Sequence, residues 1–120
     1  MNGQYSSLDE FWPFYVSQHL HPVNRRLHFW GTTMAVFVLV VAVLRRDLSL
    51  VPRALLLGYG PAWVGHYVFE KNRPATFRYA LLSLRADFRM WWYTLTNQMD
   101  TELLRLTPRL KALRAESSAP

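Results

Sequence analysis

Two apolar runs constrain the fold of this chain more than any other feature. The run Leu27–Leu44 carries no charge, and as an α-helix it would span roughly 27 Å, close to the ~30 Å hydrocarbon core of a bilayer. A second, slightly shorter run, Ala54–Phe69, contains Gly58, Gly60 and Pro61, which membrane helices tolerate where neighbouring groups satisfy the freed backbone. The two runs therefore predict a pair of membrane helices, with buried helices of a small soluble bundle as the alternative.

A turn between the runs, at residues 45–52, would fold the chain into a hairpin that brings two histidines together. His28 and His66 lie at matching ends of the two runs, so an antiparallel hairpin places them opposite each other at the same depth. Glu70 lies four residues after His66, on the same helix face. Imidazoles and a carboxylate are costly in an apolar hairpin unless they are paired or bind a metal ion.

The distribution of positive charge predicts the orientation of the hairpin. The turn carries Arg45 and Arg46, with Arg53 directly after it, partly offset by Asp47, whereas the end that bears both termini is flanked by more cations. By the positive-inside rule, both termini and the histidines lie in the cytoplasm. The membrane would be the cytoplasmic membrane of a bacterium or the endoplasmic reticulum of a eukaryote. The flanking cations are Arg25, Arg26, Lys71, Arg73, Arg78, Arg85 and Arg89.

Composition narrows the possible functions. The 120 residues allow one domain and leave no room for a separate cofactor-binding domain. The absence of cysteine excludes disulfides, thiolate metal ligands and a cysteine nucleophile. Fourteen Lys and Arg against eight Asp and Glu, together with five Trp, would suit nucleic acid or anionic lipid. Because the apolar runs favour lipid, we expect a lipid bilayer and no nucleic acid as partner.

Helical patterns outside the runs predict an all-α fold in a single membrane domain, residues 1–120. Ser7 and Glu10 fit a capping box that begins the first helix, and Pro22 ends or bends that helix. Charged residues such as Arg85 and Asp87 make the last long helix amphipathic rather than spanning. We expect a two-helix transmembrane hairpin flanked by amphipathic interfacial helices. The expected helices are residues 8–20, 24–45, 53–71 and 75–106, followed by a frayed tail, residues 107–120.

Each polar residue near the histidines also has a purely structural interpretation. His28 and His66 would each donate one hydrogen bond to a carbonyl of a neighbouring helix. Glu70 would pair with a nearby lysine or arginine. His19 would cap a helix end, where the helix dipole favours an imidazolium, and a purely structural role is most strongly indicated for His21, because it directly precedes a proline.

Considered together, these residues favour a metal site. Three histidines and a carboxylate reach one place from three helix ends. Imidazole suits zinc, copper, iron or nickel, and mixed histidine and carboxylate sites with open positions suit non-haem Fe(II), so the spacing alone leaves the metal open. Asn24, one turn before His28, fits either a hydrogen bond to a metal ligand or a cap of the first membrane helix.

Two motifs carry a resemblance to a known family. From about Phe11 to Trp92, the chain resembles the small membrane family of 2-hydroxy fatty acid dioxygenases. The resemblance implies an Fe(II)-dependent, membrane-embedded enzyme of fatty acid α-oxidation that uses O2 to remove one carbon from a 2-hydroxy fatty acid. It also implies that His19, His28 and His66 bind the iron. The motifs are His19-x-x-Pro22-x-Asn24-Arg25-x-x-His28-x-x-Gly31 and Gly65-His66-x-x-Phe69-Glu70-x-Asn72-Arg73-Pro74-Ala75.

The implied reaction gives expected roles to further residues. A 2-hydroxy acid chelates a metal through its carboxylate and hydroxyl oxygens, and its acyl chain would lie among the apolar side chains of the hairpin. Arg25 or Arg73 would bind the carboxylate by a bidentate contact. Glu70 would be either a ligand or a partner that orients a ligating histidine. The competing hypothesis is a non-catalytic helical membrane protein whose histidines pack, sense pH or bind a structural metal.

Overall fold

All secondary structure in residues 5–118, the part that the computed structural model describes, is helical, which confirms the all-α fold. The side chains described are those of residues 5–115. Contacts divide the chain into two compact units. We call residues 21–72 the hairpin unit, and the residues up to Leu20 together with those from Arg73 onward the terminal unit. The organisation of both units as one domain stays a prediction.

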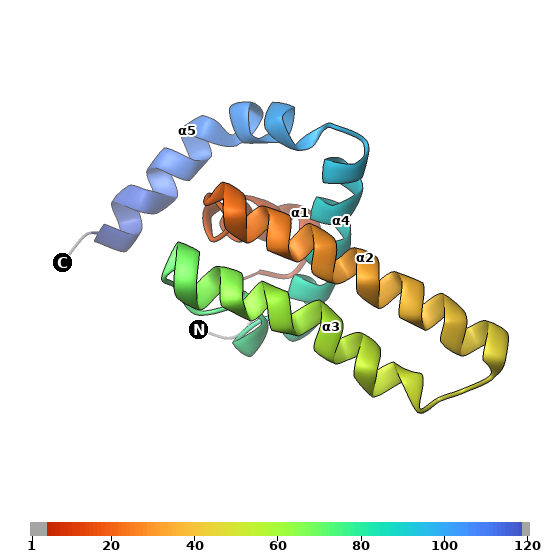
Figure 1. The fold of residues 1–120 in the computed structure, drawn as a ribbon. Coiled ribbons are helices and arrows are strands. Elements are labelled where there is room, and N and C mark those ends of the chain that lie inside the picture. The colour runs from red at the N-terminus through yellow and green to blue at the C-terminus, as the bar shows by residue number, and fades with distance from the viewer. Residues whose placement is uncertain (1–4, 119–120) are drawn as a thin grey trace. The chain divides into compact units, whose positions relative to one another are not determined.

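The hairpin unit consists of two antiparallel helices packed side by side, α2 (Pro22–Arg45) and α3 (Leu50–Val64) (Figure 1). Pro22 occupies the first position of α2, where its missing N–H would have had no partner in any case. At the other end, Arg46 adopts a left-handed conformation with φ 52° and closes the helix. Helix α2 therefore begins two residues before the expected position, and α3 begins three residues before it.

A close approach of the two backbones fixes the hairpin near its middle. A Cβ atom at Gly31 would lie 2.9 Å from the carbonyl oxygen of Gly58 and 3.1 Å from that of Leu57. Only a glycine at position 31 allows this distance between α2 and α3. The glycine in the first family motif therefore has a packing role that the sequence alone did not reveal.

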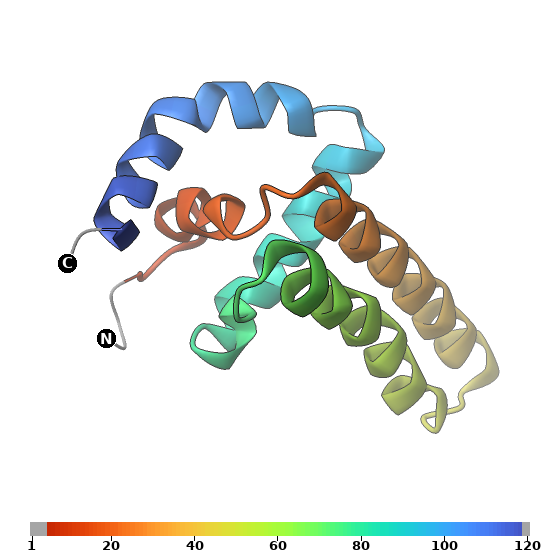
Figure 2. The same ribbon diagram turned by 60° about the vertical axis from the view of Figure 1, so that its left-hand side comes forward.

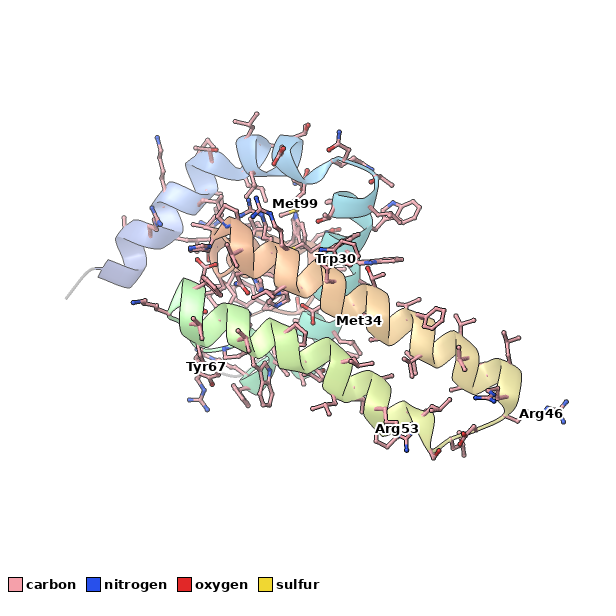
Figure 3. The ribbon with its side chains drawn as sticks, viewed as in Figure 1. Trp30, Met34, Arg46, Arg53, Tyr67 and Met99 are labelled. Atoms are coloured by element: carbon pink, nitrogen blue, oxygen red, sulfur yellow. The ribbon has the colours of Figure 1, made fainter. Side chains whose placement is uncertain are left out.

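Helix α2 is the one helix, among the residues described, that is long and apolar enough to cross a membrane. Helix α3 is shorter, and its last turn widens into a π-helix, η1 (Gly65–Glu70). The second membrane span is therefore not confirmed. Arg46 and Arg53 lie at the turn end of the hairpin and Tyr67 lies at the opposite end (Figure 3).

The terminal unit is built on an aromatic core. Helix α1 (Leu8–Ser17) contacts both α4 (Ala80–Leu95) and α5 (Met99–Ser118), and its side chains Phe11, Trp12 and Tyr15 are almost fully buried. The expected cap of α1 is present, because the hydroxyl of Ser7 accepts a hydrogen bond from the backbone N–H of Glu10 at 3.2 Å. The carboxylate of Glu10 accepts from the N–H of Ser6 rather than from that of Ser7.

The single helix expected over residues 75–106 is wrong. A short 3₁₀ turn, η2 (Ala75–Phe77), comes first, and the chain then forms α4 and α5 with a break between them (Figure 2). The break occurs at three successive polar residues, where Asn97 takes a left-handed conformation with φ 62°. Asparagine tolerates this conformation better than most residues. The N–H of Gln98 bonds the carbonyl of Tyr93 at 2.7 Å and closes the turn.

The frayed tail expected over residues 107–120 is also wrong for the residues described. Helix α5 continues to Ser118, and Leu106 and Leu110 are buried one turn apart. These two side chains join the aromatic core of the terminal unit. Burial of an apolar face on a packed core stabilises a helix that its own composition would not.

Candidate metal centre

Two buried histidines face each other inside the hairpin unit. His28 comes from the second turn of α2 and His66 from η1, and the centroids of their rings lie 4.9 Å apart with the rings nearly perpendicular. His28 is 5% exposed and His66 is 2% exposed. The expectation that these two residues meet at the same depth is confirmed. It follows from their positions at matching ends of two antiparallel helices.

The hydrogen bonds of the two imidazoles determine which ring nitrogen carries the proton. Nδ1 of His28 lies 2.9 Å from the carbonyl oxygen of Asn24, and Nδ1 of His66 lies 2.6 Å from the side-chain oxygen of Asn72. Both oxygens can only accept, so each Nδ1 donates and each Nε2 carries a lone pair. An oxygen acceptor at the second nitrogen is the usual support of a metal-binding histidine.

The π-helix brings His66 and its partner Asn72 together. The chain leaves η1 at Lys71, which is left-handed with φ 59°, and the N–H of Asn72 then bonds the carbonyl of His66 at 3.0 Å. This turn returns the Asn72 side chain to the imidazole. Single-turn π-helices are found often at functional sites. Sequence reasoning gave Asn72 no role, although it stands in the second motif.

Glu70 lies at the amino end of α2. One carboxylate oxygen accepts from the backbone N–H of His21 at 2.8 Å and from the side-chain amide of Asn24 at 3.1 Å. A carboxylate at this position compensates the unpaired N–H groups and the positive end of the helix dipole. Glu70 therefore joins η1 to α2, a role different from the ion pair with a lysine or arginine that the structural interpretation proposed.

Asn24 combines the two roles that the sequence left open. Its carbonyl accepts from His28, while its side-chain amide donates to Glu70. Its Oδ1 atom is fully buried and packs against Gly65, where an added Cβ would lie 2.1 Å away. The tight fit explains why a glycine precedes His66 at this point in the second motif.

His21 is a capping residue. It is the N-cap of α2, and its Nδ1 accepts a hydrogen bond from the backbone N–H of Val23 at 3.1 Å. This contact fits the structural interpretation, which was the stronger one for His21. A nitrogen that accepts from the backbone has its lone pair in use, so Nδ1 of His21 is not available to a metal.

His19 belongs to the terminal unit, just after α1, and is 1% exposed. Its Nδ1 lies 2.6 Å from the carbonyl oxygen of Tyr15, so here too Nδ1 donates and Nε2 carries the lone pair. The imidazole is stacked on the ring of Tyr15, with centroids 3.9 Å apart and planes at 22°. His19 therefore has the same protonation pattern as His28 and His66.

Tyr15 is itself held by a carboxylate. Its hydroxyl donates to Asp87 of α4. Burial raises the pKa of Asp87 to about 7, and it also raises the pKa of Tyr15 well above its usual value, with a further contribution from Asp87. Sequence reasoning missed both residues. The spacing of four between Tyr15 and His19 was the available signal, whereas nothing local linked Asp87 to α1.

The two arginines expected at the substrate belong to different units. Arg25 lies in the first turn of α2 and is partly buried. Arg73 opens the second part of the terminal unit, and its guanidinium carbon lies 5.0 Å from the ring centroid of Phe77.

The class of protein that emerges is a small helical protein with three buried histidines, each able to offer a nitrogen ligand to a metal ion. A family model described as 2-hydroxy-palmitic acid dioxygenase Mpo1-like matches residues 5–99. The chain therefore belongs to this family, as the two histidine motifs predicted. No curated protein and no solved structure matches the chain.

Proposed function

We propose that this protein is an Fe(II)-dependent dioxygenase that removes one carbon from 2-hydroxy fatty acids at a membrane. The family description supports the reaction class and the substrate class. The observation that carries the proposal is that His19, His28 and His66 are buried and each donates Nδ1–H to an oxygen acceptor. Imidazoles supported in this way suit a metal ion through Nε2.

The residues present fit Fe(II). Three neutral nitrogen donors without a thiolate suit iron and leave other coordination positions open. His28 and His66, whose rings face each other in the hairpin unit, would be two of the iron ligands. His19 would be the third ligand, because the peptide chain holds it within about 7 Å of His21, whose N–H binds Glu70. When bound, Fe(II) would supply the centre at which O2 and the hydroxy acid react.

The protein side chains would position the reactants and the ligands. Asn24, Asn72 and the Tyr15 carbonyl orient the three imidazoles, and Glu70 holds η1 against α2. Arg25, one residue after Asn24, is the proposed partner of the substrate carboxylate, and Arg73 lines a cavity of the terminal unit. The acyl chain would be bound by apolar side chains, at about 0.8 kcal/mol for each buried methylene.

We further propose that the hairpin unit is inserted in the membrane, with α2 as one span and α3 together with η1 as the other. Several large apolar side chains on both helices face outward, which is costly in water and favourable in lipid. Both termini would lie in the cytoplasm, at the cytoplasmic membrane of a bacterium or the endoplasmic reticulum of a eukaryote. The outward-facing side chains include Trp30, Phe37, Val43, Leu44, Leu55, Leu56 and Trp63.

The reaction is tested with the purified full chain, Fe(II), O2 and 2-hydroxypalmitate. Mass spectrometry should detect a fatty acid or aldehyde one carbon shorter, alongside O2 consumption, without added 2-oxoglutarate. None is needed because a 2-hydroxy acid and O2 together balance to the shorter acid, CO2 and water. Palmitate should not react, because it lacks the hydroxyl oxygen that places C1 and C2 at the metal.

Each other result has a distinct meaning. If the protein retains iron but consumes neither acid, the substrate class is wrong. If palmitate reacts as fast as 2-hydroxypalmitate, the requirement for the hydroxyl is wrong. If the protein retains no iron and forms no product, the non-catalytic alternative is favoured.

A further inference from the structure

A cavity of about 420 Å³ in the terminal unit is lined by cations and aromatic rings. None of its lining residues is acidic. It lies between the end of α1 and the segment that enters α4, and its lining includes none of the three histidines or of the residues that accept their hydrogen bonds. Its lining residues include Phe14, Gln18, Arg73, Phe77, Arg78 and Tyr79.

The two arginines are held by neighbouring rings. The guanidinium carbon of Arg73 lies 5.0 Å from the ring centroid of Phe77, and that of Arg78 lies 5.4 Å from the ring centroid of Tyr79. A cation–π contact uses the flat face of a guanidinium and leaves its N–H edges available for hydrogen bonds. The cavity therefore presents donors whose orientation is partly fixed.

These arginines differ from others in the same unit. Arg89 pairs with Asp9 at 3.1 Å, and Arg105 pairs with a glutamate one turn away. Within the described part of the chain, Arg73 and Arg78 have no carboxylate partner. Two cations at one cavity without an acid to neutralise them attract an anion from outside the chain.

A buried hydroxyl at the same cavity also lacks a partner. Tyr79 is 8% exposed, and its hydroxyl makes no hydrogen bond to any described residue. A buried hydroxyl left without a hydrogen bond costs about 1–3 kcal/mol. A ligand or solvent that enters the cavity would provide the missing partner.

An apolar stripe begins at this cavity and continues along α4. Its side chains are 41–63% exposed and follow one another at spacings of three or four residues; those from Leu81 to Leu95 share one face of α4, and Phe77 precedes them in η2. The opposite face of α4 packs into the core through Ala86 and Met90. The stripe consists of Phe77, Leu81, Leu84, Phe88, Trp92 and Leu95.

We propose that this cavity binds the terminal phosphate of a membrane phospholipid of the phosphatidic acid type, with the acyl chains along the stripe of α4. A terminal phosphate carries a charge near −1.5 to −2. It therefore balances the two positive charges of the guanidiniums better than the single negative charge of a carboxylate would. The combination of a basic cavity and a continuous apolar face matches the two ends of a phospholipid. None of the lining residues is a proposed iron ligand, so either proposal can fail without the other.

The test uses the full chain in neutral detergent micelles that contain a small fraction of phosphatidic acid or phosphatidylcholine. Native mass spectrometry should detect phosphatidic acid, and not phosphatidylcholine, retained on the protein. The double variant Arg73→Gln/Arg78→Gln should reduce the retained fraction by roughly tenfold or more, because two charge-assisted contacts are lost. Arg73→Lys/Arg78→Lys keeps the charge but loses the planar fork, and should retain an intermediate amount.

Arg85→Gln/Arg109→Gln is the matched control. It removes the same charge from exposed arginines of the terminal unit outside the cavity, and should retain phosphatidic acid like the wild type. Equal loss in both double variants would mean that binding depends on net charge alone, which overturns the proposal. Iron retention, measured on the same samples, should not change in either variant.

Two competitors separate the ligand classes. Inorganic phosphate at millimolar concentration should displace phosphatidic acid only weakly, because it cannot use the stripe. Full displacement by inorganic phosphate would make the cavity a site for a free anion. Displacement by equimolar 2-hydroxypalmitate would assign the cavity to the fatty acid instead. Either outcome overturns the assignment to a phospholipid.

Discussion

At the scale of single residues, the shared feature of the three histidines is the partner of Nδ1. In each case that partner is an oxygen that can only accept, provided by Tyr15, Asn24 or Asn72. Two of the three are backbone carbonyls one turn before the histidine, and the third is the Asn72 side chain just beyond η1. The imidazoles are therefore held in one tautomer before any ligand is bound.

The proposed ligands can be separated from the capping histidine by mutation. His28→Ala and His66→Ala are each expected to abolish iron retention while the protein stays helical, because each removes one of three nitrogen ligands. His21→Ala should retain iron and lose about 1 kcal/mol of stability, because only an N-cap is lost. Metal analysis and circular dichroism of the purified variants provide the measurement. Full iron retention in His28→Ala would contradict the assignment.

Tyr15 is expected to position His19. Tyr15→Phe keeps the stacked ring and the backbone carbonyl but removes the hydroxyl that donates to Asp87. The lost hydroxyl anchors the ring on which His19 is stacked, so we expect metal affinity to fall by up to roughly the 10-fold that follows loss of a ligand's own partner. Titration with Co(II), followed by its visible absorption, should show weaker binding and an altered band shape. If the variant is less stable than the wild type but binds Co(II) with the same affinity, Tyr15 is a core residue that does not position His19.

Asp87 should make stability depend on pH. Its pKa is about 7 in the folded protein, above its usual 3.8, because burial disfavours the charged carboxylate. Between these values the unfolded chain ionises first, so the contribution of Asp87 to stability is complete below pH 4 and is lost as pH rises through 7. Asp87→Asn should therefore exceed the wild type at pH 8 by on the order of a few kcal/mol and match it near pH 4. Chemical unfolding at pH 4 and pH 8 measures the free energy of unfolding of both proteins. The prediction is wrong if the difference between the variant and the wild type is the same at the two pH values.

At the scale of helices, backbone contact between α2 and α3 determines the geometry of the hairpin unit. Gly31 allows the approach to Gly58, and Gly65 leaves room for the Asn24 side chain. The end of α3 then widens into η1, which turns His66 toward α2. In η1, Gly65 lies against the Asn24 side chain and Glu70 bonds the start of α2. Helix propensity does not predict the widening, because these contacts are made with another helix.

Two glycine substitutions should have opposite effects on the hairpin unit. Gly31→Ala places a Cβ 2.9 Å from a backbone oxygen of α3, so the helices must separate, at about 1–3 kcal/mol of stability. Gly60→Ala has nothing within 4 Å of the new Cβ and should stabilise α3 by up to about 1 kcal/mol. Thermal unfolding in detergent distinguishes them. If both variants unfold at the same temperature, close backbone contact does not limit the packing.

At the scale of the whole molecule, the number of segments that cross the membrane determines on which sides the two termini lie. Helix α2 alone meets the criteria of length and apolar character among the described helices. Helix α3 reaches a comparable length only together with η1. The antiparallel packing of α2 and α3 favours insertion of both, because α3 stays packed against α2 when α2 enters the bilayer.

Both termini are expected on one side of the membrane. An even number of spans returns the chain to the side from which it entered, and the greater number of cations near the termini favours the cytoplasm. Tags at the two ends should be equally accessible to protease in sealed vesicles of known orientation. Termini on opposite sides would mean that α2 spans alone, and the proposed second span would be wrong.

The sequence determined the features that depend on local periodicity and on matched positions. Apolar runs of helical length predicted α2 and α3, and the positions of His28 and His66 at their matching ends predicted that the imidazoles meet. A structural role for His21 also followed from its position before Pro22, although the N-cap itself was seen only in the structure. These inferences hold because, in an antiparallel pair of helices, residues at equal distances from the turn along the chain lie at the same height along the helix axes.

Only the tertiary structure decided contacts between segments far apart in the chain. The bond between Tyr15 and Asp87, and the position of Glu70 at the start of α2, join residues separated by 72 and 49 positions. The continuation of α5 past residue 106 likewise depended on tertiary contacts, because Leu106 and Leu110 are buried in the core that α1 helps to form. Local pattern carries no information on such contacts, because burial and hydrogen-bond satisfaction are properties of the assembled core.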